Sequence, residues 1–378
     1  MTAFRVNQLT LTDFRNYDTL RLEPGGRCTV LYGPNGAGKT NILEALSLLS
    51  PGRGCRNAAL PEFSRRNGPG NWFVFARVEG ALGATDIGTG FRPESEGGSR
   101  RQLRIDSETH GSTAILGQHM AVLWVTPAMD RLFVEAPSGR RRFLDRMVLA
   151  FDPTHAARVN AYERAMRERA KLLKIGRQDP SWLAGLEAQM AEHGVAIAAA
   201  RLDLVGRLTA AMVDAAPAGF PALSVAVTGG LEDWLAEGMS AVDVEDRAMA
   251  GLEQSRPRDA EAGRTQFGPH LSDLEVVYLA KAMPARECST GEQKALLLSL
   301  ILGQAQLVSW ARGAMPLLLL DEVAAHLDPD RRKALFSALF ELGGQAFVTG
   351  TDRGLFDGAT GPDTDYYRVD QGRIVLES

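Results

Sequence analysis

The order of apolar and polar residues in the first part of the chain predicts short strands around one glycine-rich loop. Residues 6–14, VNQLTLTDF, alternate as a half-buried strand does, and residues 27–33, RCTVLYG, fit a short buried strand. The loop follows at once and leads into an expected helix, TNILEALSLL, at residues 40–49. From residue 71 to about 105 the apolar positions recur at every second residue among many glycines, which predicts an antiparallel hairpin layer. MAVLWVTP, at residues 120–127, predicts one more buried strand.

The middle of the chain has helical spacing instead. Helices are expected in RRRFLDRMVL (140–149), ARVNAYERAMRERAKLLK (157–174) and residues 182–213, the last two separated by the breaker IGRQDPS. Their charged stripe is typical of a solvated face rather than of a binding site. Buried strands return in PLLLLDE and QAFVTG, and the end of the chain, YYRVDQGRIVLES, predicts a hairpin. We therefore expect an α/β fold in which a helical arm, residues 136–262, is inserted between residues 1–135 and 263–378.

Composition limits the classes of function. The 378 residues are 45% hydrophobic and 23% charged, enough for a large core and roughly two domains. The formal net charge is −4, so contact with nucleic acid would depend on local basic patches. Cys28, Cys55 and Cys288 are odd in number and lack metal spacing, which favours a reducing compartment over disulfides or zinc. No signal region and no apolar run of membrane-spanning length is apparent, so we expect a cytoplasmic protein without a membrane partner.

The glycine-rich loop matches a phosphate-binding motif. GPNGAGKT fits G-x-x-x-x-G-K-[ST] and lies between a strand and a helix, the context that this motif requires. Its backbone is expected to face phosphate oxygens, Lys39 to bridge the outer phosphates and the Thr40 hydroxyl to bind Mg²⁺. The predicted nucleotide-binding residues are Gly33, Pro34, Asn35, Gly36, Ala37, Gly38, Lys39 and Thr40.

An acidic pair follows the leucine-rich strand near residue 320. In such sheets ligands bind at the carboxyl ends of strands, where this strand delivers Asp321 and Glu322. Asp321 is expected to hold Mg²⁺. Glu322, taken to point to the opposite side of the strand, is expected to polarise the attacking water. Beside a phosphate loop, this interpretation is favoured over two acidic residues that simply end a strand.

ECSTGEQK, residues 287–294, is expected to begin a helix, and its first residues fit either a helix cap or an anion-binding site. Ser289 can cap the helix, with Glu292 three residues later, and an apolar face follows. The small residues Thr290 and Gly291 also leave bare backbone N–H groups that suit an anion.

Taken together, these motifs resemble the ABC-type ATPases. The resemblance implies an ATPase head, with a mixed sheet around the phosphate loop and an antiparallel layer. It also implies that Ser289 and Gly291 form a signature motif that contacts ATP bound to a second subunit, and that the loop residue Asp328 crosses the dimer interface. Two features of the pattern are missing: Thr349, Thr351 and Asp352 occupy the place of the switch histidine, and Thr126 and Pro127 that of the glutamine loop. Slow or partner-dependent ATP hydrolysis is therefore expected.

The whole chain further resembles the RecF family of bacterial recombination and repair ATPases. Beyond the loop and the acidic strand, the matching segments are LTDFRNY (11–17), RRRFLDR (140–146), GPH (268–270) and STGEQK (289–294). The resemblance implies an ATP-dependent homodimer that binds DNA at single-strand gaps or junctions. With the partners RecO and RecR it would load recombinase and support SOS induction. Leu271 and Ser272 depart from the charged pair usual after GPH, so His270 is as well explained by a structural turn as by a function.

Candidate DNA contacts come from local arginines. They are Arg53, Arg56, Arg65 and Arg66, and the cluster Arg140, Arg141 and Arg142, for which a helix-start charge cluster is an equal alternative. Arg15 and Asn16 either reach the nucleotide or cap the sheet edge.

The sequence also allows two other functions. A transporter-associated ATPase would need the switch histidine and a surface for a membrane partner. A DNA-independent ATP-binding regulator would fit a dead hydrolytic site, against which the intact Lys39, Thr40, Asp321 and Glu322 argue. We favour a slow ATPase that DNA stimulates.

Overall fold

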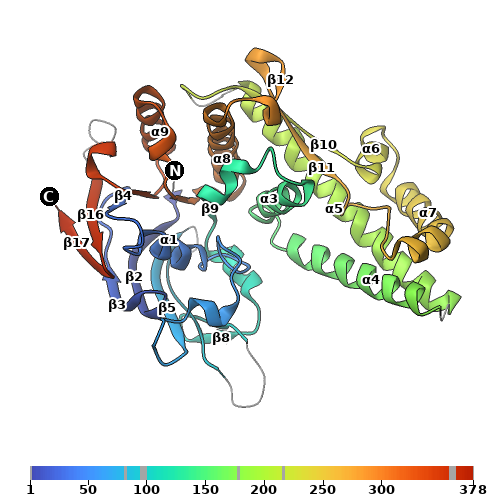
Figure 1. Cartoon of the computed structure of the whole chain (residues 1–378), viewed down its shortest axis with the longest axis horizontal. Helices are drawn as coiled ribbons and strands as arrows, with labels where there is room; N and C mark the ends of the chain where they lie inside the picture. Colours follow the sequence, from blue (N-terminus) through green and yellow to red (C-terminus); the bar gives the residue numbers. More distant parts are fainter. Residues whose placement is uncertain are drawn as a thin grey trace. The chain divides into compact units, whose positions relative to one another are not determined.

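The computed structural model describes residues 2–80, 83–93, 100–176, 179–214, 218–356 and 363–377. The chain divides into two compact units (Figure 1). The first comprises Met1–Asp130, Ala216–Pro221 and Ser289–Ser378, and the second comprises Arg131–Ala215 and Ala222–Cys288. The ATPase motifs at the two ends of the sequence therefore lie in one unit.

A mixed six-stranded sheet forms the centre of the first unit. Its order is β17-β16-β4-β15-β14-β9, and all neighbours are parallel except the terminal hairpin β16–β17. The strands are β4 (Cys28–Tyr32), β9 (Val122–Val125), β14 (Leu317–Leu320), β15 (Ala346–Gly350), β16 (Thr364–Asp370) and β17 (Arg373–Glu377). Helix α1 (Lys39–Ser47) contacts β9, β14 and β15, so the phosphate loop opens at the carboxyl ends of parallel strands.

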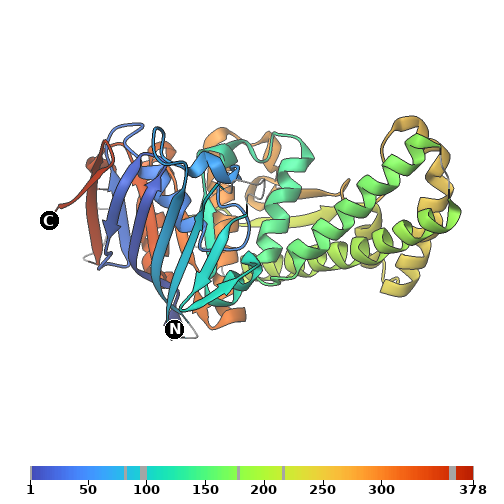
Figure 2. The same cartoon turned by 90° about the horizontal axis from the view of Figure 1, so that it is seen from below.

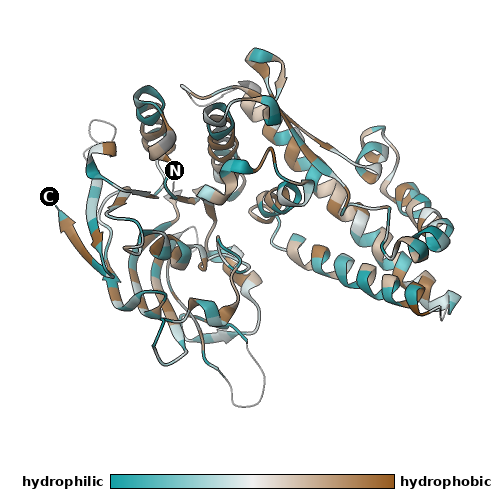
Figure 3. Ribbon diagram, in the orientation of Figure 1, coloured by the Kyte–Doolittle hydropathy of each residue, from teal (hydrophilic) through white to brown (hydrophobic). Residues whose placement is uncertain are grey.

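Two further helices of the first unit follow the signature and acidic motifs. Helix α8 (Thr290–Arg312) is long and apolar enough to cross a membrane by length and composition, which corrects the expectation that no apolar run reaches that length. However, 83% of the apolar window is buried in the protein, so α8 has the composition of a core helix (Figure 3). Helix α9 (Pro329–Leu342) begins directly after Asp328.

The predicted hairpin layer is a second, antiparallel sheet of the first unit. Its order is β3-β2-β5-β6-β7-β8, and its long strands lie side by side in Figure 2. The strands are β2 (Arg5–Phe14), β3 (Tyr17–Leu22), β5 (Trp72–Gly80), β6 (Gly83–Phe91), β7 (Gln102–Ile105) and β8 (Glu108–His110). One face of this sheet buries Phe14 and Trp72 against Phe63 of the turn η1 (Leu60–Phe63), with ring centroids 5.3–5.7 Å apart.

Short elements complete the first unit. β1 (Thr2–Ala3) pairs with β13 (Ala314–Met315). The remaining turns and short helices are η2 (Thr113–Ile115), α2 (Leu116–His119), η6 (Ala324–His326) and η7 (Arg353–Phe356), and η3 (Pro127–Arg131) ends at the boundary of the unit.

The second unit is mainly helical but also contains a sheet. Its helices are α3 (Pro137–Leu149), α4 (His155–Ile175), α5 (Pro180–Asp214), α6 (Gly230–Ala236) and α7 (Ala241–Ala262), and its short turns are η4 (Leu279–Lys281) and η5 (Ala285–Glu287). Strands β10 (Leu223–Thr228), β11 (Asp273–Tyr278) and β12 (Met283–Pro284) form an antiparallel sheet. The expectation of an all-helical arm is therefore corrected. Residues 263–288, placed with the ATPase head from the sequence, lie in this unit because β11 pairs with β10 along its length.

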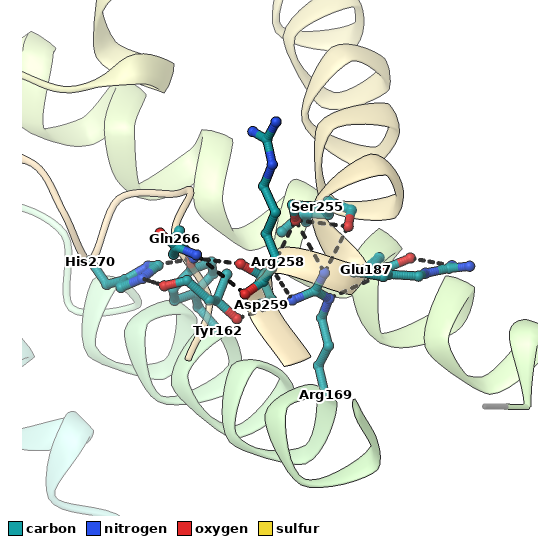
Figure 4. A network of polar contacts seen from close by, with 11 residues as sticks. Tyr162, Arg169, Glu187, Ser255, Arg258, Asp259, Gln266 and His270 are labelled. Carbon is teal, nitrogen blue, oxygen red and sulfur yellow. Dashed lines mark hydrogen bonds and ion pairs between the residues drawn. The ribbon is translucent and has the colours of Figure 1, made fainter. Parts of the chain in front are cut away.

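A buried arginine joins three helices of the second unit (Figure 4). Arg169 of α4 is fully buried and donates to Glu187 of α5 at 2.8 Å, to Asp259 of α7 at 2.7 Å and to the carbonyl of Leu252 at 2.7 Å. Paired and fully hydrogen-bonded in this way, the guanidinium fixes the three helices relative to one another.

His270 lies at the other end of the same network. Its Nδ1 is 2.7 Å from the Tyr162 hydroxyl and its Nε2 is 3.0 Å from the Thr265 carbonyl, so both ring nitrogens have partners within the unit. Burial lowers the pKa of His270, which favours the neutral ring that these contacts need. These contacts agree with the first explanation given for His270, a structural role in the turn at residues 268–270.

Candidate nucleotide-binding site

The phosphate loop is held in a conformation that glycine alone fits at two positions. Gly33 and Gly38 have φ values of 144° and 118°. A Cβ would lie 2.1 Å from the Val369 carbonyl oxygen at Gly33 and 2.5 Å from the Tyr17 hydroxyl at Gly38. Asn16 supports the loop from outside by donating to the Ala37 carbonyl at 2.9 Å. Asn16 thus shapes the loop, a role that the sequence did not indicate.

Lys39 lies inside the loop rather than in solvent. Its side chain is 4% exposed, and its ammonium donates to the carbonyls of Gly33 at 2.7 Å and Pro34 at 3.1 Å. The Glu322 carboxylate is 3.6 Å away. The ammonium therefore lies inside the loop at the start of α1, a position that suits the outer phosphates of a nucleotide.

Three side chains from separate elements meet beside Lys39. The Asp321 carboxylate, 3% exposed, accepts from the hydroxyl of Thr40 at 2.9 Å and from that of Thr349 at 2.7 Å, both at Oδ1. A hydroxyl and a carboxylate this close are hard oxygen ligands of the kind that Mg²⁺ takes together with phosphate oxygens and water. Among the described residues there is no group of three or more His, Cys, Asp or Glu side chains that could hold a metal ion.

Glu322 differs from its predicted placement. Strand β14 ends at Leu320, and Glu322 has a left-handed backbone with φ 53°, so the two acidic residues do not alternate across a strand as expected. The Glu322 N–H donates to the Thr349 hydroxyl at 2.9 Å. An unusual backbone held by surrounding contacts is typical of functional positions, and this one turns the carboxylate toward Lys39.

Lys294 is a residue of this site that sequence analysis missed. It belongs to α8 and is 3% exposed, and its ammonium lies 3.3 Å from the Glu322 carbonyl and 3.4 Å from the Asp130 carboxylate. Burial lowers its pKa, while the charges of Asp130, Glu322 and Asp321 oppose that shift. The helix that begins with the signature motif thus also contacts the nucleotide site of its own chain.

A cavity of about 520 Å³ opens between these groups. It is lined by Asn35, Gly36, Gly38, Lys39, Thr40, Asn41, Cys55, Arg56, Thr126, Pro127, Ala128, Asp321 and Glu322. This volume is in the usual range for ligand sites. Thr126 and Pro127 line it at the place of the missing glutamine. Burial raises the pKa of the Cys55 thiol to about 11, which keeps it protonated and unreactive.

The signature residues have contacts within their own chain. Ser289 caps α8, since its hydroxyl oxygen accepts from the Glu292 N–H at 3.4 Å. In return the Glu292 carboxylate accepts from the Ser289 N–H at 2.9 Å and from its hydroxyl at 2.8 Å. Asp328 caps α9 by accepting from the N–H of Arg331 at 2.8 Å. Ser289 and Asp328 are both exposed, whereas Gly291 is half-buried. Their contact with a second subunit stays a prediction.

The candidate DNA-binding arginines fall into two groups. Arg140 forms a bidentate pair with Asp273 at 2.7 Å, and Arg141 donates to the Ser272 carbonyl at 2.7 Å, so both have partners within the second unit. Arg65 pairs with Asp13 and Asp18. Arg56 lines the nucleotide cavity, 3.6 Å from Glu44. The exposed members are Arg53, Arg56, Arg66 and Arg142.

Arg15 was expected either to reach the nucleotide or to cap the sheet edge, but its guanidinium has another partner. It pairs with the fully buried Glu44 of α1 through two contacts of 2.7 Å, so its charge offsets the cost of burying that carboxylate.

Comparison with known proteins places this site in a family. The family model described as RecF/RecN/SMC N terminal domain matches residues 5–372. The chain is 50% identical over 370 residues to the DNA replication and repair protein RecF of Rhizobium johnstonii, and 48% identical over 370 residues to that of Rhizobium meliloti, covering 98% of both chains each time.

Solved structures agree on the fold. The recombination mediator protein RecF with ATPrS, of the RecFOR pathway, has a TM-score of 0.86 at 23% identity, over 100% of this chain and 99% of that one. The Smc head domain of Pyrococcus furiosus has a TM-score of 0.56 at 15% identity, over 99% and 96%. The predicted ABC-type ATPase head is thereby confirmed. With this fold and half-identical relatives over nearly its full length, the chain belongs to the RecF family of DNA replication and repair proteins.

Proposed function

We propose that this protein is an ATP-dependent DNA-binding ATPase of recombinational repair, which dimerises around ATP. The observation that carries the proposal is the convergence of Lys39, Thr40, Asp321 and Glu322 on one cavity, with all four chemical groups intact. The resemblance to RecF structures solved with ATP and with ATPrS supports the choice of nucleotide.

Each residue of the site has a distinct role in this proposal. Lys39 exchanges its contacts with the Gly33 and Pro34 carbonyls for the outer phosphates. Thr40 and Asp321 would hold Mg²⁺, which would supply positive charge to neutralise the phosphates. The Glu322 carboxylate, 3.6 Å from the Lys39 ammonium, accepts a proton from the attacking water. Thr349 fixes Asp321 and the Glu322 backbone through one hydroxyl, in place of a switch histidine.

The exposed N-terminus of α8 is the proposed dimer contact. Ser289 and Gly291 would bind the outer phosphate of ATP held by a second copy, with Asp328 across the same interface. In the single chain the Glu292 carboxylate accepts hydrogen bonds from the Ser289 N–H and hydroxyl. An arriving phosphate must displace that carboxylate, because two anions cannot share these donors. This competition makes the contact dependent on a bound triphosphate.

DNA is the proposed partner of the dimer. Relatives at about 50% identity are named DNA replication and repair proteins, and a structural neighbour is named a recombination mediator of the RecFOR pathway. We extend this to binding at single-strand gaps or junctions, recombinase loading with RecO and RecR, support of SOS induction, and a cytoplasmic location with the DNA. Arg53, Arg66 and Arg142, which are exposed, are the remaining candidates for phosphate contacts.

Sedimentation with and without ATP, in the presence of gapped duplex DNA, tests this function. The wild-type protein should double its mass with ATP and sediment with the DNA. Ser289→Arg should bind ATP as a monomer but not dimerise, because the guanidinium occupies the space of the phosphate. Ser289→Ala, which removes only the cap hydroxyl, should cost about 1 kcal/mol of stability if the cap is its sole role. A fully dimeric Ser289→Arg protein would rule out the signature role.

A further inference from the structure

The antiparallel sheet has an open face that the nucleotide site does not use. Its pairing places Phe73 of β5 opposite Gly90 of β6, and Phe75 opposite Gly88. On the next strand Arg104 is opposite Gly88. We call this hollow the sheet groove. It has a volume of about 1020 Å³ and is lined by Phe73, Val74, Phe75, Gly88–Gly90, Arg100–Arg104 and Thr109–Thr113.

Glycines keep the floor of the sheet groove flat. At Gly90 a Cβ would lie 2.4 Å from the Phe73 ring, so the ring rests directly on the backbone of β6. The guanidinium of Arg92 also lies over that ring, 5.2 Å from its centroid. At Gly88 the nearest atom to a Cβ would be in Arg104, 3.9 Å away, which leaves open space between Phe75 and Arg104. Phe73 and Phe75 are half-buried, although the flanking Trp72 and Val74 are fully buried on the opposite face.

The described residues that line the sheet groove give it positive charge. Arg100 and Arg104 are exposed, as is Arg92 beside the groove, and no ion pair joins these three arginines to a carboxylate in the described part of the chain. Other exposed arginines of this sheet are neutralised, Arg77 by Asp86 at 2.8 Å and Arg21 by Glu23. Arg101 has partners within the protein instead. It donates to the Gly52 carbonyl and to the Thr89 hydroxyl of β6, each at 2.7 Å.

We propose that the sheet groove binds single-stranded DNA. The Phe75 ring, half-buried beside open space on a flat sheet, can stack an unpaired base, and nearby arginines can bind the sugar-phosphate backbone or stack as planar cations. A single strand is the occupant that fits, because a duplex keeps its base faces inside the stack and offers Phe75 nothing to contact. The inference rests on the proposed function only in taking DNA as the partner. It adds a site separate from the arginines predicted from the sequence.

Paired variants of Phe75 give the most direct test. Phe75→Leu keeps apolar bulk but removes the ring, whereas Phe75→Tyr keeps the ring. The Kd for a fluorescent oligothymidylate should rise ~10-fold in Phe75→Leu and stay unchanged in Phe75→Tyr. Blunt duplex DNA, measured alongside, should bind both variants as it binds the wild type. Arg104→Ala should lower the slope of log K against log salt for the oligothymidylate by about 0.7, the value for one lost phosphate contact to a single strand.

Controls separate the sheet groove from the rest of the surface. Trp310→Ala and Arg373→Ala remove exposed side chains outside it and should bind oligothymidylate normally. An oligonucleotide with photoreactive iodouracil should crosslink to residues 73–75 or 100–104, located by mass spectrometry. Equal Kd values for Phe75→Leu and the wild type, with crosslinks elsewhere, would overturn the inference and leave DNA binding intact. Binding of gapped or duplex DNA without oligothymidylate would do the same. If the wild type binds no DNA even with ATP, the proposed function fails as well.

Discussion

The Thr349 hydroxyl is the single group on which both acidic residues of the nucleotide site depend. It donates to Asp321 at 2.7 Å and accepts the Glu322 N–H at 2.9 Å, and Thr349 is fully buried. Thr349→Val keeps the branched shape and removes only the hydroxyl. We expect this variant to bind ATP but to hydrolyse it slowly.

The size of the effect follows from these two contacts. Loss of a hydrogen bond to an ionised group costs about 1.5–3 kcal/mol, and a buried N–H without an acceptor costs about 1–3 kcal/mol. The two contacts share one oxygen, so their loss is less than additive, and we expect about 3 kcal/mol in the free energy of unfolding of the first unit. Hydrolysis should slow by at least ~10-fold, because the strained backbone of Glu322 loses the contact that fixes it.

Thr349→Ser is the matched control. It keeps the hydroxyl and loses one methyl group, at a cost of about 1 kcal/mol. Unfolding in urea and single-turnover ATP hydrolysis should be measured on both variants. The reasoning is refuted if Thr349→Val and Thr349→Ser hydrolyse ATP equally fast, since the hydroxyl would then have no part in positioning the acidic pair.

Three other changes test separate parts of the account. Glu322→Gln should retain ATP affinity but slow single-turnover hydrolysis, because an amide cannot accept a proton from water; a normal rate would place the base elsewhere. Lys294→Met should lower the hydrolysis rate without changing the Kd for ATP, and Lys294→Arg should restore part of the rate; equal loss of affinity would instead indicate a role in binding. Arg169→Met leaves the buried Asp259 carboxylate without an ion pair, and Glu187 with Arg256 as its remaining partner, so it should lower the free energy of unfolding of the second unit by about 3–5 kcal/mol, measured in urea, with ATP affinity unchanged. A loss below about 1 kcal/mol would show that the buried network is not a main stabilising feature.

The sequence predicted the parts of the site that are local in the chain. The phosphate loop needs its glycines, Lys39 and Thr40 within eight consecutive residues, and the strand before Asp321 is an unbroken apolar run. In both patterns the functional residues are contiguous with the strand or helix that positions them. These elements and their place in the sheet could therefore be predicted.

Residues that reach the site from a distance could not be predicted. Thr349 and Lys294 are each 28 residues from their partners in the acidic pair, and nothing in their own segments marks them. Local composition also left two interpretations of Arg140 equally open, because its ion-pair partner Asp273 is 133 residues away. An arginine cluster has the same appearance in a sequence whether it binds DNA or pairs within its own domain.

The small sheet of the second unit shows the same limit. Leu223–Thr228 alternates over only six residues between the long helix α5 and the short helix α6, and its partner strand begins 45 residues later. Periodicity over so short a segment is a weak signal, and the pairing that stabilises it is not local.

Direct titration of Mg²⁺ and ATP into the wild-type protein and into Lys39→Ala tests the central claim, that this site is built to bind a nucleoside triphosphate. Lys39 makes two hydrogen bonds within the loop that it would exchange for phosphate contacts. Each phosphate contact of the ammonium contributes about 1.5–3 kcal/mol to the free energy of binding. Loss of both predicts a Kd for ATP that is at least ~100-fold higher for the variant. Equal affinity of the two proteins for ATP, or no binding by the wild type, would contradict the account.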